Sequence, residues 1–279
     1  MTNRRGVPVR TLLALLLAAL ILIPLSMMLT VSLNPSEEQI QISLGTLKAF
    51  VPHTASLLNY EQVLTDPNHP FGRYLLNTLL IVITTVGLGV FVNSSAAFAL
   101  AWGVGGYRKA FLAVIIALYV IPVESVMLPL LLMVSRLGWV DTYHVQILPF
   151  IANSFAIFLF YQFFSSLPRE LIEAARIDGA RLTHVYFRIA LPLSGPIIAT
   201  VGVLGFLEVW NSYLWPVMVT RGPEVRPLAV AMVTFFNSQQ SYWGDIMAFA
   251  MLMTAPVIAV FLAFQRFFVA SIMRAGVKG

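Results

Sequence analysis

Long uninterrupted runs of apolar residues constrain this chain more than any other feature of its sequence. Each run is close to the roughly 20 residues that a helix needs to cross the hydrocarbon core of a bilayer. Six runs are present, at about Thr11–Leu33, Tyr74–Trp102, Phe111–Val134, Val145–Phe164, Leu193–Val219 and Asp245–Phe264. The sequence therefore predicts an all-α integral membrane protein with six transmembrane helices.

The composition is not that of a soluble protein. Of the 279 residues, 59% are hydrophobic and only 10% are charged, against roughly 25% charged residues in ordinary soluble domains. Cysteine is absent, which excludes disulfides, thiolate catalysis and cysteine-based zinc sites. The net charge of +5 is not gathered in a dense basic run, so nucleic acid is not expected as a partner and membrane lipid is.

The basic residues of the loops predict how the chain is oriented. Twelve of the 17 Lys and Arg residues lie on one side of the expected membrane and five on the other. An excess of Lys and Arg is typical of the cytoplasmic side, so both termini are expected in the cytoplasm. Residues 34–72 and 221–244 are then outside. The first run is longer than the core of a signal peptide and is interpreted as a retained helix.

The loop between the fourth and fifth runs, residues 167–192, has the pattern of a helix, a bend and a second helix. Pro168 suits the first helical turn, and Ser165 or Ser166 is expected to cap it. Gly179 is a natural stop. A second helical stretch is expected from Leu182 to Ala190, ending at Pro192.

Small residues on the first of these helices leave two interpretations open. Ala174 and Ala175 would allow another surface to approach closely, as in a helix that docks into a groove. The same segment could equally be a surface helix that ties two spans together. The residues of the loop alone do not separate the two interpretations.

The spacing within the loop resembles a known family. The matching positions are Glu173-Ala174-Ala175, then Gly179 after three residues, and Ile189-Ala190-Leu191-Pro192 after nine more. This pattern is similar to the EAA motif of the permease subunits of binding-protein-dependent ABC importers. The resemblance covers about residues 71–279, and residues 1–70 match more loosely. The C-terminal end is similar to the MalG-like half of carbohydrate-uptake permease pairs.

The resemblance implies a type I ABC importer permease fold. The chain would comprise an N-terminal transmembrane helix with its outer loop, residues 1–70, and a transmembrane core, residues 71–279. The loop would be a coupling helix seated in a cleft of an ATPase subunit. The residues implied in this contact are Glu173, Ala174, Ala175, Asp178, Gly179, Ile189, Leu191 and Pro192.

The resemblance also implies partners and a location. A second, homologous permease subunit would complete a heterodimer, an ATPase dimer would bind on the cytoplasmic side, and a solute-binding protein would dock outside. The chain would be a multi-pass protein of the inner or plasma membrane of a prokaryote. ATP and magnesium would bind to the ATPase, and no cofactor is expected in this chain.

The sequence contains no motif that indicates catalysis by the chain itself. A Gly-x-x-x-x-Gly-Lys-Ser/Thr phosphate loop is absent, so ATP hydrolysis is expected on a separate subunit. The Gly-x-Ser-x-Gly and His-Glu-x-x-His patterns are also absent. The four histidines lie in different loops, so no metal site is expected and most of them are expected to be solvated.

Two acidic residues fall within or beside apolar runs. A charged side chain at membrane depth costs free energy unless it faces a polar cavity or a partner. The two residues are Glu124 in the third run and Glu208 in the fifth. Both are candidates for the translocation path, although structural hydrogen bonds would also explain them. Trp210, Asn211 and Tyr213 could bind a polyol or form an interfacial aromatic belt.

Helix-breaking residues are frequent around the fifth run, and broken helices often line a pathway. Interruptions are expected at Pro192, Pro196, Gly202, Gly205 and Pro216.

Two other functions remain open at this point. A secondary transporter or channel could use Glu124 and Glu208 for ion coupling, and a membrane enzyme could use the same acids. For an importer, the carbohydrate branch implies a sugar, an oligosaccharide or a polyol. A glycerol phosphate also remains open, because Pro122-Val123-Glu124 is similar to a segment of glycerol-phosphate permeases.

Overall fold

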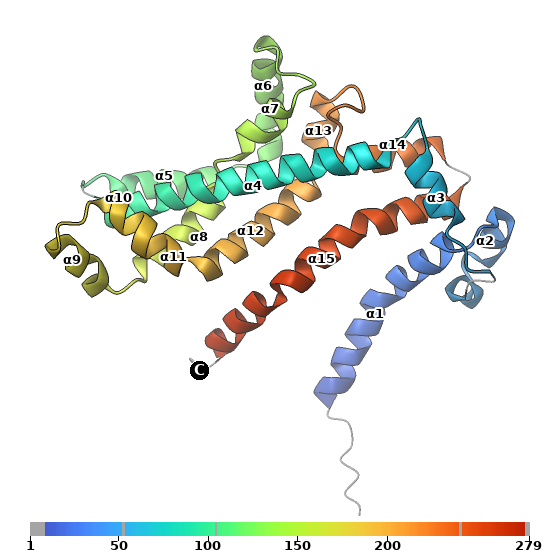
Figure 1. The fold of residues 1–279 in the computed structure, drawn as a ribbon, viewed down its shortest axis with the longest axis horizontal. Helices are drawn as coiled ribbons and strands as arrows, with labels where there is room; N and C mark the ends of the chain where they lie inside the picture. Colours follow the sequence, from blue (N-terminus) through green and yellow to red (C-terminus); the bar gives the residue numbers. More distant parts are fainter. Residues whose placement is uncertain (1–8, 52–53, 104, 240–241, 277–279) are drawn as a thin grey trace, which may run out of the picture. The chain divides into compact units, whose positions relative to one another are not determined.

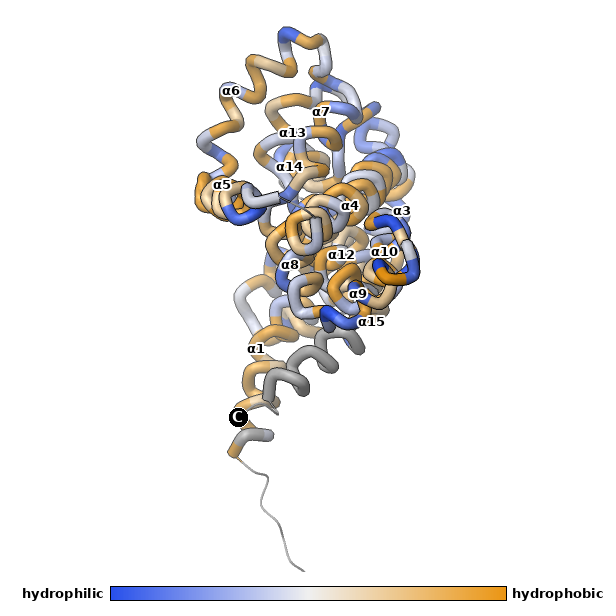
Figure 2. The backbone as a smooth tube through the Cα atoms, turned by 90° about the vertical axis from the view of Figure 1, so that its left-hand side faces the viewer, coloured by the Kyte–Doolittle hydropathy of each residue, from blue (hydrophilic) through white to orange (hydrophobic). Residues whose placement is uncertain are grey.

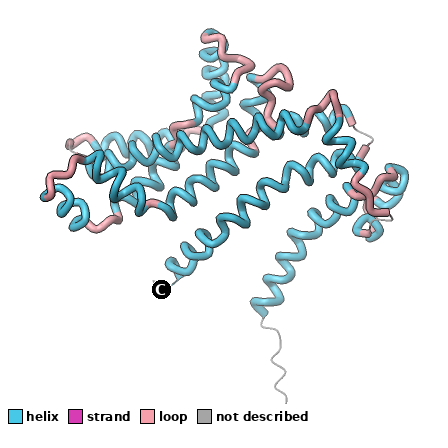
Figure 3. Tube along the Cα trace, in the orientation of Figure 1, coloured by secondary structure: helices cyan, strands magenta, loops and turns pink. Residues whose placement is uncertain are grey.

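The computed structural model describes residues 9–51, 54–103, 105–239 and 242–276. Within these ranges the regular structure is helical and no strand is present (Figure 3), in agreement with the predicted all-α fold. The elements are α1 (Val9–Ser32), α2 (Glu37–Ser43), η1 (Leu47–Phe50), α3 (Leu58–Thr65), α4 (Phe71–Trp102), α5 (Arg108–Val120), α6 (Val123–Arg136), α7 (Tyr143–Ile147), η2 (Leu148–Phe150), α8 (Ser154–Ser165), α9 (Arg169–Ile177), α10 (Leu182–Val185), η3 (Tyr186–Ala190), α11 (Leu191–Leu193), α12 (Gly195–Trp210), α13 (Leu214–Val219), α14 (Leu228–Ser238) and α15 (Trp243–Gly276).

The chain divides into two compact units. Unit 1 comprises Met1–Gly72 and Ala231–Pro256, and unit 2 comprises Arg73–Val230 and Val257–Gly279. The helices α4, α14 and α15, which Figure 1 labels, each contribute residues to both units. The division into residues 1–70 and 71–279 stays a prediction.

Three described helices are long and apolar enough to cross a membrane alone. They are Thr11–Ser32 of α1, all of α4, and Trp243–Gln265 of α15. Three bent helix pairs pass the same test together, which makes up to six spans. Hydrophobic residues predominate along α1 and α4 (Figure 2). Which side of the membrane each loop faces stays a prediction.

The third predicted span, Phe111–Val134, is not one straight helix. α5 and α6 are bent by 94° relative to each other. Between them, Ile121 and Pro122 have ψ angles of 120° and 132°, far from helical values. A proline disfavours the helical conformation at the residue before it and cannot donate a backbone hydrogen bond. The break therefore follows from Pro122.

The fourth predicted span, Val145–Phe164, is also divided. α7 and η2 are separated from α8 by a bend of 40°. Asn153 marks the new start, because its side chain accepts a hydrogen bond from the Ala156 N–H at 2.9 Å. An asparagine at this place caps the first turn of a helix.

The fifth predicted span is interrupted next to Pro192 and Pro196, as expected, because α11 ends at Leu193 and α12 begins at Gly195 after a bend of 76°. α12 runs continuously through Gly202 and Gly205 to Trp210, so the interruptions expected at these glycines are wrong. A Cβ on Gly205 would meet the side chain of Val86 in α4 at 3.4 Å, so the glycine permits close packing. A second interruption lies at residues 211–213, before α13, where none was expected.

Helix α14 was not expected, because residues 221–244 were assigned to an outer loop. It has 11 residues and is mostly apolar, too short to span a bilayer alone.

The sixth predicted span is confirmed as a helix, since α15 begins at Trp243 and continues through Pro256.

In unit 1, polar groups hold the segment after α1 against the start of α15. The Glu37 carboxylate accepts hydrogen bonds from the N–H groups of Trp243 and Gly244 at 2.9 and 2.7 Å. A carboxylate is stabilising at the N-terminus of a helix, where backbone N–H groups are unpaired. Asn59 donates to the carbonyl oxygens of Ser32 and Asn34, both at 2.9 Å.

In unit 2, α8 packs against α5 and α12, and an aromatic core lies among α4, α8, α9, α10 and η3. Phe98 of α4 and Phe164 of α8 make an edge-to-face contact with ring centres 5.4 Å apart. Both are buried, as are Phe160 and Tyr186. Such pairs add to the stabilisation from apolar burial, so the loop that carries α9 rests on a packed core.

Candidate functional site

The loop predicted to bind a partner carries a separate short helix, α9, at one end of unit 2 (Figure 1). α9 begins at Arg169, directly after Pro168, whose ψ of 131° places it outside the helix. No described side chain caps this end, and Ser166 instead ends α8. The expected caps at Ser165 and Ser166 are therefore wrong. As in every α-helix, the N–H groups of the first turn of α9 have no partner within the helix.

Gly179 ends the first helix as predicted, and it does so through a Schellman motif. Its φ is +78°, a conformation that glycine adopts without steric cost. The Gly179 N–H bonds to the Arg176 carbonyl at 3.0 Å, and the Ala180 N–H bonds to the Ala175 carbonyl at 2.9 Å, as this motif requires. A Cβ at Gly179 would have no described heavy atom within 4 Å. The need for glycine is therefore conformational.

The second helical stretch, predicted at Leu182–Ala190, is longer and contains a π-helical turn. α10, η3 and α11 follow one another without a gap. In η3 the N–H of Leu191 bonds to the carbonyl of Tyr186, five residues earlier. Pro192 follows directly and has no N–H for an α-helical bond, a situation in which a π turn can occur. The chain then bends by 76° before α12.

Most of the residues implied in coupling are accessible. Ile172 is 1% exposed and anchors α9 to the core, whereas Ile177 is 86% exposed. The exposed coupling residues are Glu173, Ala174, Asp178, Gly179 and Pro192, and the half-buried ones are Ala175, Ile189 and Leu191. Helical periodicity places Ala174 and Ile177 on the face opposite Ile172. α9 therefore has one anchored face and one free face with a small and an apolar residue.

Arg176 ties α9 to the end of α4. Its guanidinium Nη2 donates to the Trp102 carbonyl at 2.9 Å, and the Trp102 indole donates to the Phe164 carbonyl at 2.8 Å. The last carbonyls of a helix lack intrahelical partners and attract cations. The hydroxyl of Tyr186 in η3 bonds to that of Ser94 in α4 at 2.8 Å. Both halves of the loop therefore contact α4, a feature that the sequence interpretation missed.

Unit 2 also contains a cavity of about 700 Å³, a size typical of small-molecule sites. Its walls come from α4, the α5–α6 break, the segment from α7 to α8, and α12. The lining is mostly apolar, with polar groups from Thr78, Thr85, Asn93, Tyr119, Gln146, Asn153, Ser154, Glu208 and Ser212. Of the 35 lining residues, Glu208 is the one that carries a charge.

The Glu208 carboxylate lies beside a pair of fixed amide side chains. The Asn153 side-chain amide is 3.4 Å from Glu208 Oε2. The backbone N–H of Asn153 donates a hydrogen bond to Asn93 Oδ1 at 2.9 Å. The side-chain amide of Asn93 donates to the Ile151 carbonyl at 3.0 Å. These two bonds hold the Asn93 amide, and the bond from the Ala156 N–H to Asn153 Oδ1 holds the Asn153 amide. The cavity therefore presents a pre-arranged polar wall.

The other residues predicted for the path do not join Glu208 in this cavity. Glu124 is exposed in the first turn of α6. Trp210 is 1% exposed and stacks on Phe206 with ring centres 5.2 Å apart. Asn211 bonds to the Leu207 carbonyl of its own helix at 2.8 Å, and Tyr213 is 39% exposed. Their place on a path stays a prediction.

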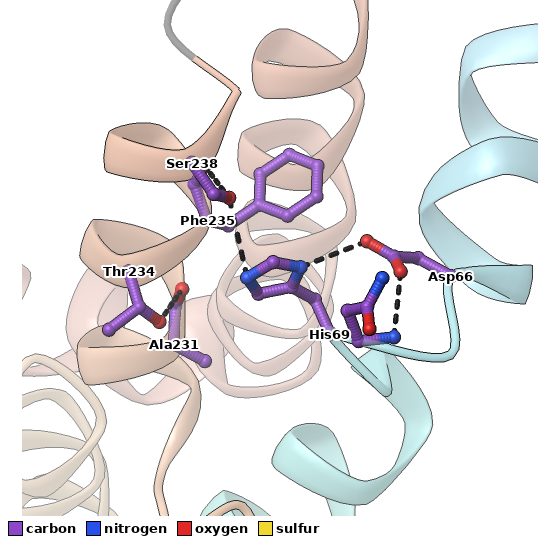
Figure 4. A network of polar contacts seen from close by, with 7 residues as sticks. Asp66, His69, Ala231, Thr234, Phe235 and Ser238 are labelled. Atoms are coloured by element: carbon purple, nitrogen blue, oxygen red, sulfur yellow. Dashed lines mark hydrogen bonds and ion pairs between the residues drawn. The ribbon is translucent and has the colours of Figure 1, made fainter.

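A polar group in unit 1 was not expected from the sequence (Figure 4). His69 Nδ1 is 2.9 Å from Asp66 Oδ2, and His69 Nε2 is 3.3 Å from the Ser238 hydroxyl. The imidazole also lies edge-on to the Phe235 ring, with ring centres 5.3 Å apart. His69 is therefore an exception to the expectation that most of the histidines are solvated.

The Asp66 carboxyl has a shifted pKa with a definable cause. Partial burial raises its pKa, but hydrogen bonds from the Asn68 N–H and the His69 ring, with attraction to a protonated His69, outweigh burial. The pKa therefore lies below its ordinary value of 3.8. Across the described ranges, no group of three or more His, Cys, Asp or Glu side chains is placed to hold a metal ion.

An all-helical fold with several apolar spans, an exposed helix–glycine–helix loop and an internal cavity defines a membrane transport component. The chain belongs to the family of binding-protein-dependent transport system inner membrane components, whose profile matches residues 89–274. The family resemblance read from the loop is thereby confirmed.

Several relatives are similar over most of their length. The arabinooligosaccharides permease protein AraQ of Halalkalibacterium halodurans is 32% identical, over 94% of this chain and 93% of its own. The melibiose/raffinose/stachyose import permease MelC of Bacillus subtilis is 32% identical over 96% of both. The sn-glycerol-3-phosphate permease UgpE of Yersinia enterocolitica is 34% identical over 72% of both.

A solved structure supports the fold. A chain of a bacterial ABC transporter that imports the acidic polysaccharide alginate superposes with a TM-score of 0.81 and 24% identity. The alignment covers 93% of this chain and 95% of that chain. The chain is therefore a permease component with the fold of an ABC importer subunit.

Proposed function

We propose that this chain is one of two permease subunits of an ATP-driven importer in the inner membrane of a prokaryote. The solute would be a saccharide or a polyol, because relatives are named for arabinooligosaccharides and for melibiose, raffinose and stachyose. A homologous second permease subunit would complete the path. A related alginate importer is described in complex with a ligand-bound periplasmic protein, which supports delivery by a solute-binding protein.

The exposed helix α9 with its glycine-terminated bend is the observation that carries this proposal. α9 would dock into a cleft of a separate ATPase subunit, which would bind ATP and magnesium. Ala174 and Ile177 on the free face would lie against that subunit, and Glu173 would pair with a basic group there. A small residue beside an exposed apolar one suits a helix that enters a groove.

The contacts behind α9 support a route for motion into the membrane. Arg176 joins α9 to the end of α4, and α10, η3 and α11 continue directly toward α12. A displacement of α9 by the ATPase would therefore be passed to two helices that line the cavity. The cavity would form this chain's half of the translocation path, with Glu208 at its wall.

A charge reversal on α9 tests the docking. Glu173→Lys is expected to reduce co-purification of the ATPase subunit and ATP-dependent uptake by roughly tenfold or more, as for a paired interface charge. Glu224→Lys makes the same change at another exposed glutamate, and we expect it to leave ATPase co-purification at the level of the unaltered chain. Unchanged co-purification and uptake in Glu173→Lys would contradict the proposal.

A further inference from the structure

The charge balance of the unit 2 cavity restricts what can pass through it. Its 35 lining residues include one carboxylate, Glu208, and no lysine, arginine or histidine. The single ion pair found among the described side chains joins His69 and Asp66, so the Glu208 carboxylate is not neutralised by a neighbouring cation. The wall around it is mostly apolar, which strengthens an electric field relative to open water.

We propose that Glu208 makes this cavity select against anions, so that the importer carries an uncharged saccharide or polyol and not a phosphorylated or uronic-acid solute. This inference rests on the proposed function, because it assumes that the cavity is part of the path. It goes further by naming the charge class of the solute and the residue, Glu208, that discriminates between uncharged and anionic solutes.

The surroundings of Glu208 match the needs of a neutral polyhydroxyl solute. The Glu208 side chain is exposed to the cavity, and its oxygens can accept hydrogen bonds from hydroxyl groups. Asn153 and Ser154 add neutral polar groups at the same wall. A phosphate or a uronate would find no cationic partner on this wall and would be repelled by the carboxylate.

Sequence similarity alone does not make this distinction. The relative named for arabinooligosaccharides is 32% identical to the chain, and the relative named for sn-glycerol-3-phosphate is 34% identical. The two solutes differ in charge, whereas the identities are nearly equal. We therefore assign the charge class of the solute from the cavity wall of this chain and not from sequence identity.

The absence of cysteine from the chain permits a direct measurement of the potential in the cavity. A Ser154→Cys variant places one thiol on the cavity wall, next to Asn153. The complete importer, reconstituted in nanodiscs, is treated with a cationic trimethylammonium or an anionic sulfonate methanethiosulfonate. The measurement is made at about pH 8, above the ordinary titration range of a carboxyl group. Mass spectrometry of this chain gives both reaction rates.

The ratio of the cationic to the anionic rate reports the sign of the potential. Replacing Glu208 by Gln, which keeps an acceptor for the Asn153 amide, is expected to lower this ratio by roughly tenfold. Glu208→Asp keeps the negative charge, so the ratio of the cationic to the anionic rate should stay close to that with Glu208. Ser165→Cys, at the other end of α8 and about 16 Å away along the helix, should show no dependence on residue 208, because salt screens this distance.

Two results would overturn the inference at this step. Equal ratios with Glu, Asp and Gln at position 208 would show that the carboxylate does not set the potential. Reaction at Ser165→Cys without any reaction at Ser154→Cys would show that the cavity is closed to hydrated solutes. Neither readout requires ATP or the cognate solute, so failure here is distinct from failure of the proposed coupling.

Transport by the complete importer tests the solute class itself. Arabinotriose and sn-glycerol 3-phosphate serve as uncharged and anionic probes at equal concentration. Faster uptake of arabinotriose is expected, and Glu208→Gln should narrow the difference. Faster uptake of sn-glycerol 3-phosphate by the unaltered importer would overturn the assignment.

Discussion

At the residue scale, one backbone torsion angle shapes the loop that follows α9. Gly179 has a φ of +78°, and a Cβ there would meet no described neighbour within 4 Å. A side chain is therefore disfavoured by the backbone conformation and not by crowding. Asparagine adopts this conformation more readily than other non-glycine residues.

Substitutions at Gly179 should follow backbone preference. Gly179→Ala is expected to destabilise the bend by about 1 kcal/mol, and Gly179→Asn by less. Thermal unfolding of the purified importer and solute-stimulated ATP hydrolysis would measure both effects. A larger loss with Asn than with Ala would show that side-chain size matters more than the torsion angle.

The Asp66–His69 pair predicts a pH dependence of stability. The hydrogen bonds of Asp66 favour its ionised form, so its folded pKa lies below 3.8. The resulting stabilisation is present above the unfolded pKa and is lost as the pH falls through the lower, folded pKa. Asp66→Asn should therefore lower the melting temperature at about pH 6 and change it little near pH 3. A larger effect of the substitution at low pH would contradict this sign.

At the element scale, α9 combines an anchored face with a free face. Ile172 and Ile177 are chemically identical, but they are 1% and 86% exposed. The pair therefore separates what holds the helix to the core from what a partner would contact.

Alanine at these two positions should have opposite consequences. Ile172→Ala is expected to cost about 2–4 kcal/mol, because it leaves a cavity in the core. Ile177→Ala should change stability by less than about 0.5 kcal/mol, as exposed positions do, yet it should weaken ATPase binding. Hydrogen exchange of α9 and co-purification of the ATPase measure the two effects. A destabilisation by Ile177→Ala as large as that by Ile172→Ala would contradict the assigned faces.

The helices that the sequence predicted best are the long, uniformly apolar ones. The runs at Tyr74–Trp102 and Asp245–Phe264 lie within the helices α4 and α15. The run at Phe111–Val134 was predicted as one span because hydropathy does not register the conformational effect of Pro122. α14 was missed because its 11 residues are fewer than a span needs.

The candidate site was predictable in part for a similar reason. Gly179 and the helical stretches around it follow from local preferences, and a carboxylate in an apolar run singled out Glu208. The acceptor of Arg176 is a backbone carbonyl 74 residues away, and Asn153 is 55 residues from Glu208. Contacts of this kind depend on how helices pack, which one sequence does not display.

At the scale of the whole molecule, large apolar side chains remain uncovered by protein. Along α1, Leu16 is 63% exposed and Leu20 is 67% exposed. Such a surface would be unfavourable in water, at roughly 25 cal/mol per Å² of apolar area, and it fits a lipid environment. It also leaves area for the second permease subunit of the proposed importer.

Solute uptake into proteoliposomes tests the central claim most directly. The vesicles contain this chain, its partner permease and the ATPase subunits, with the solute-binding protein and its solute on the opposite side. We predict uptake that requires ATP, the ATPase subunits and the binding protein, and that persists when an ionophore collapses the proton gradient. Uptake that continues without the ATPase and stops with the ionophore would contradict the account and indicate a secondary transporter.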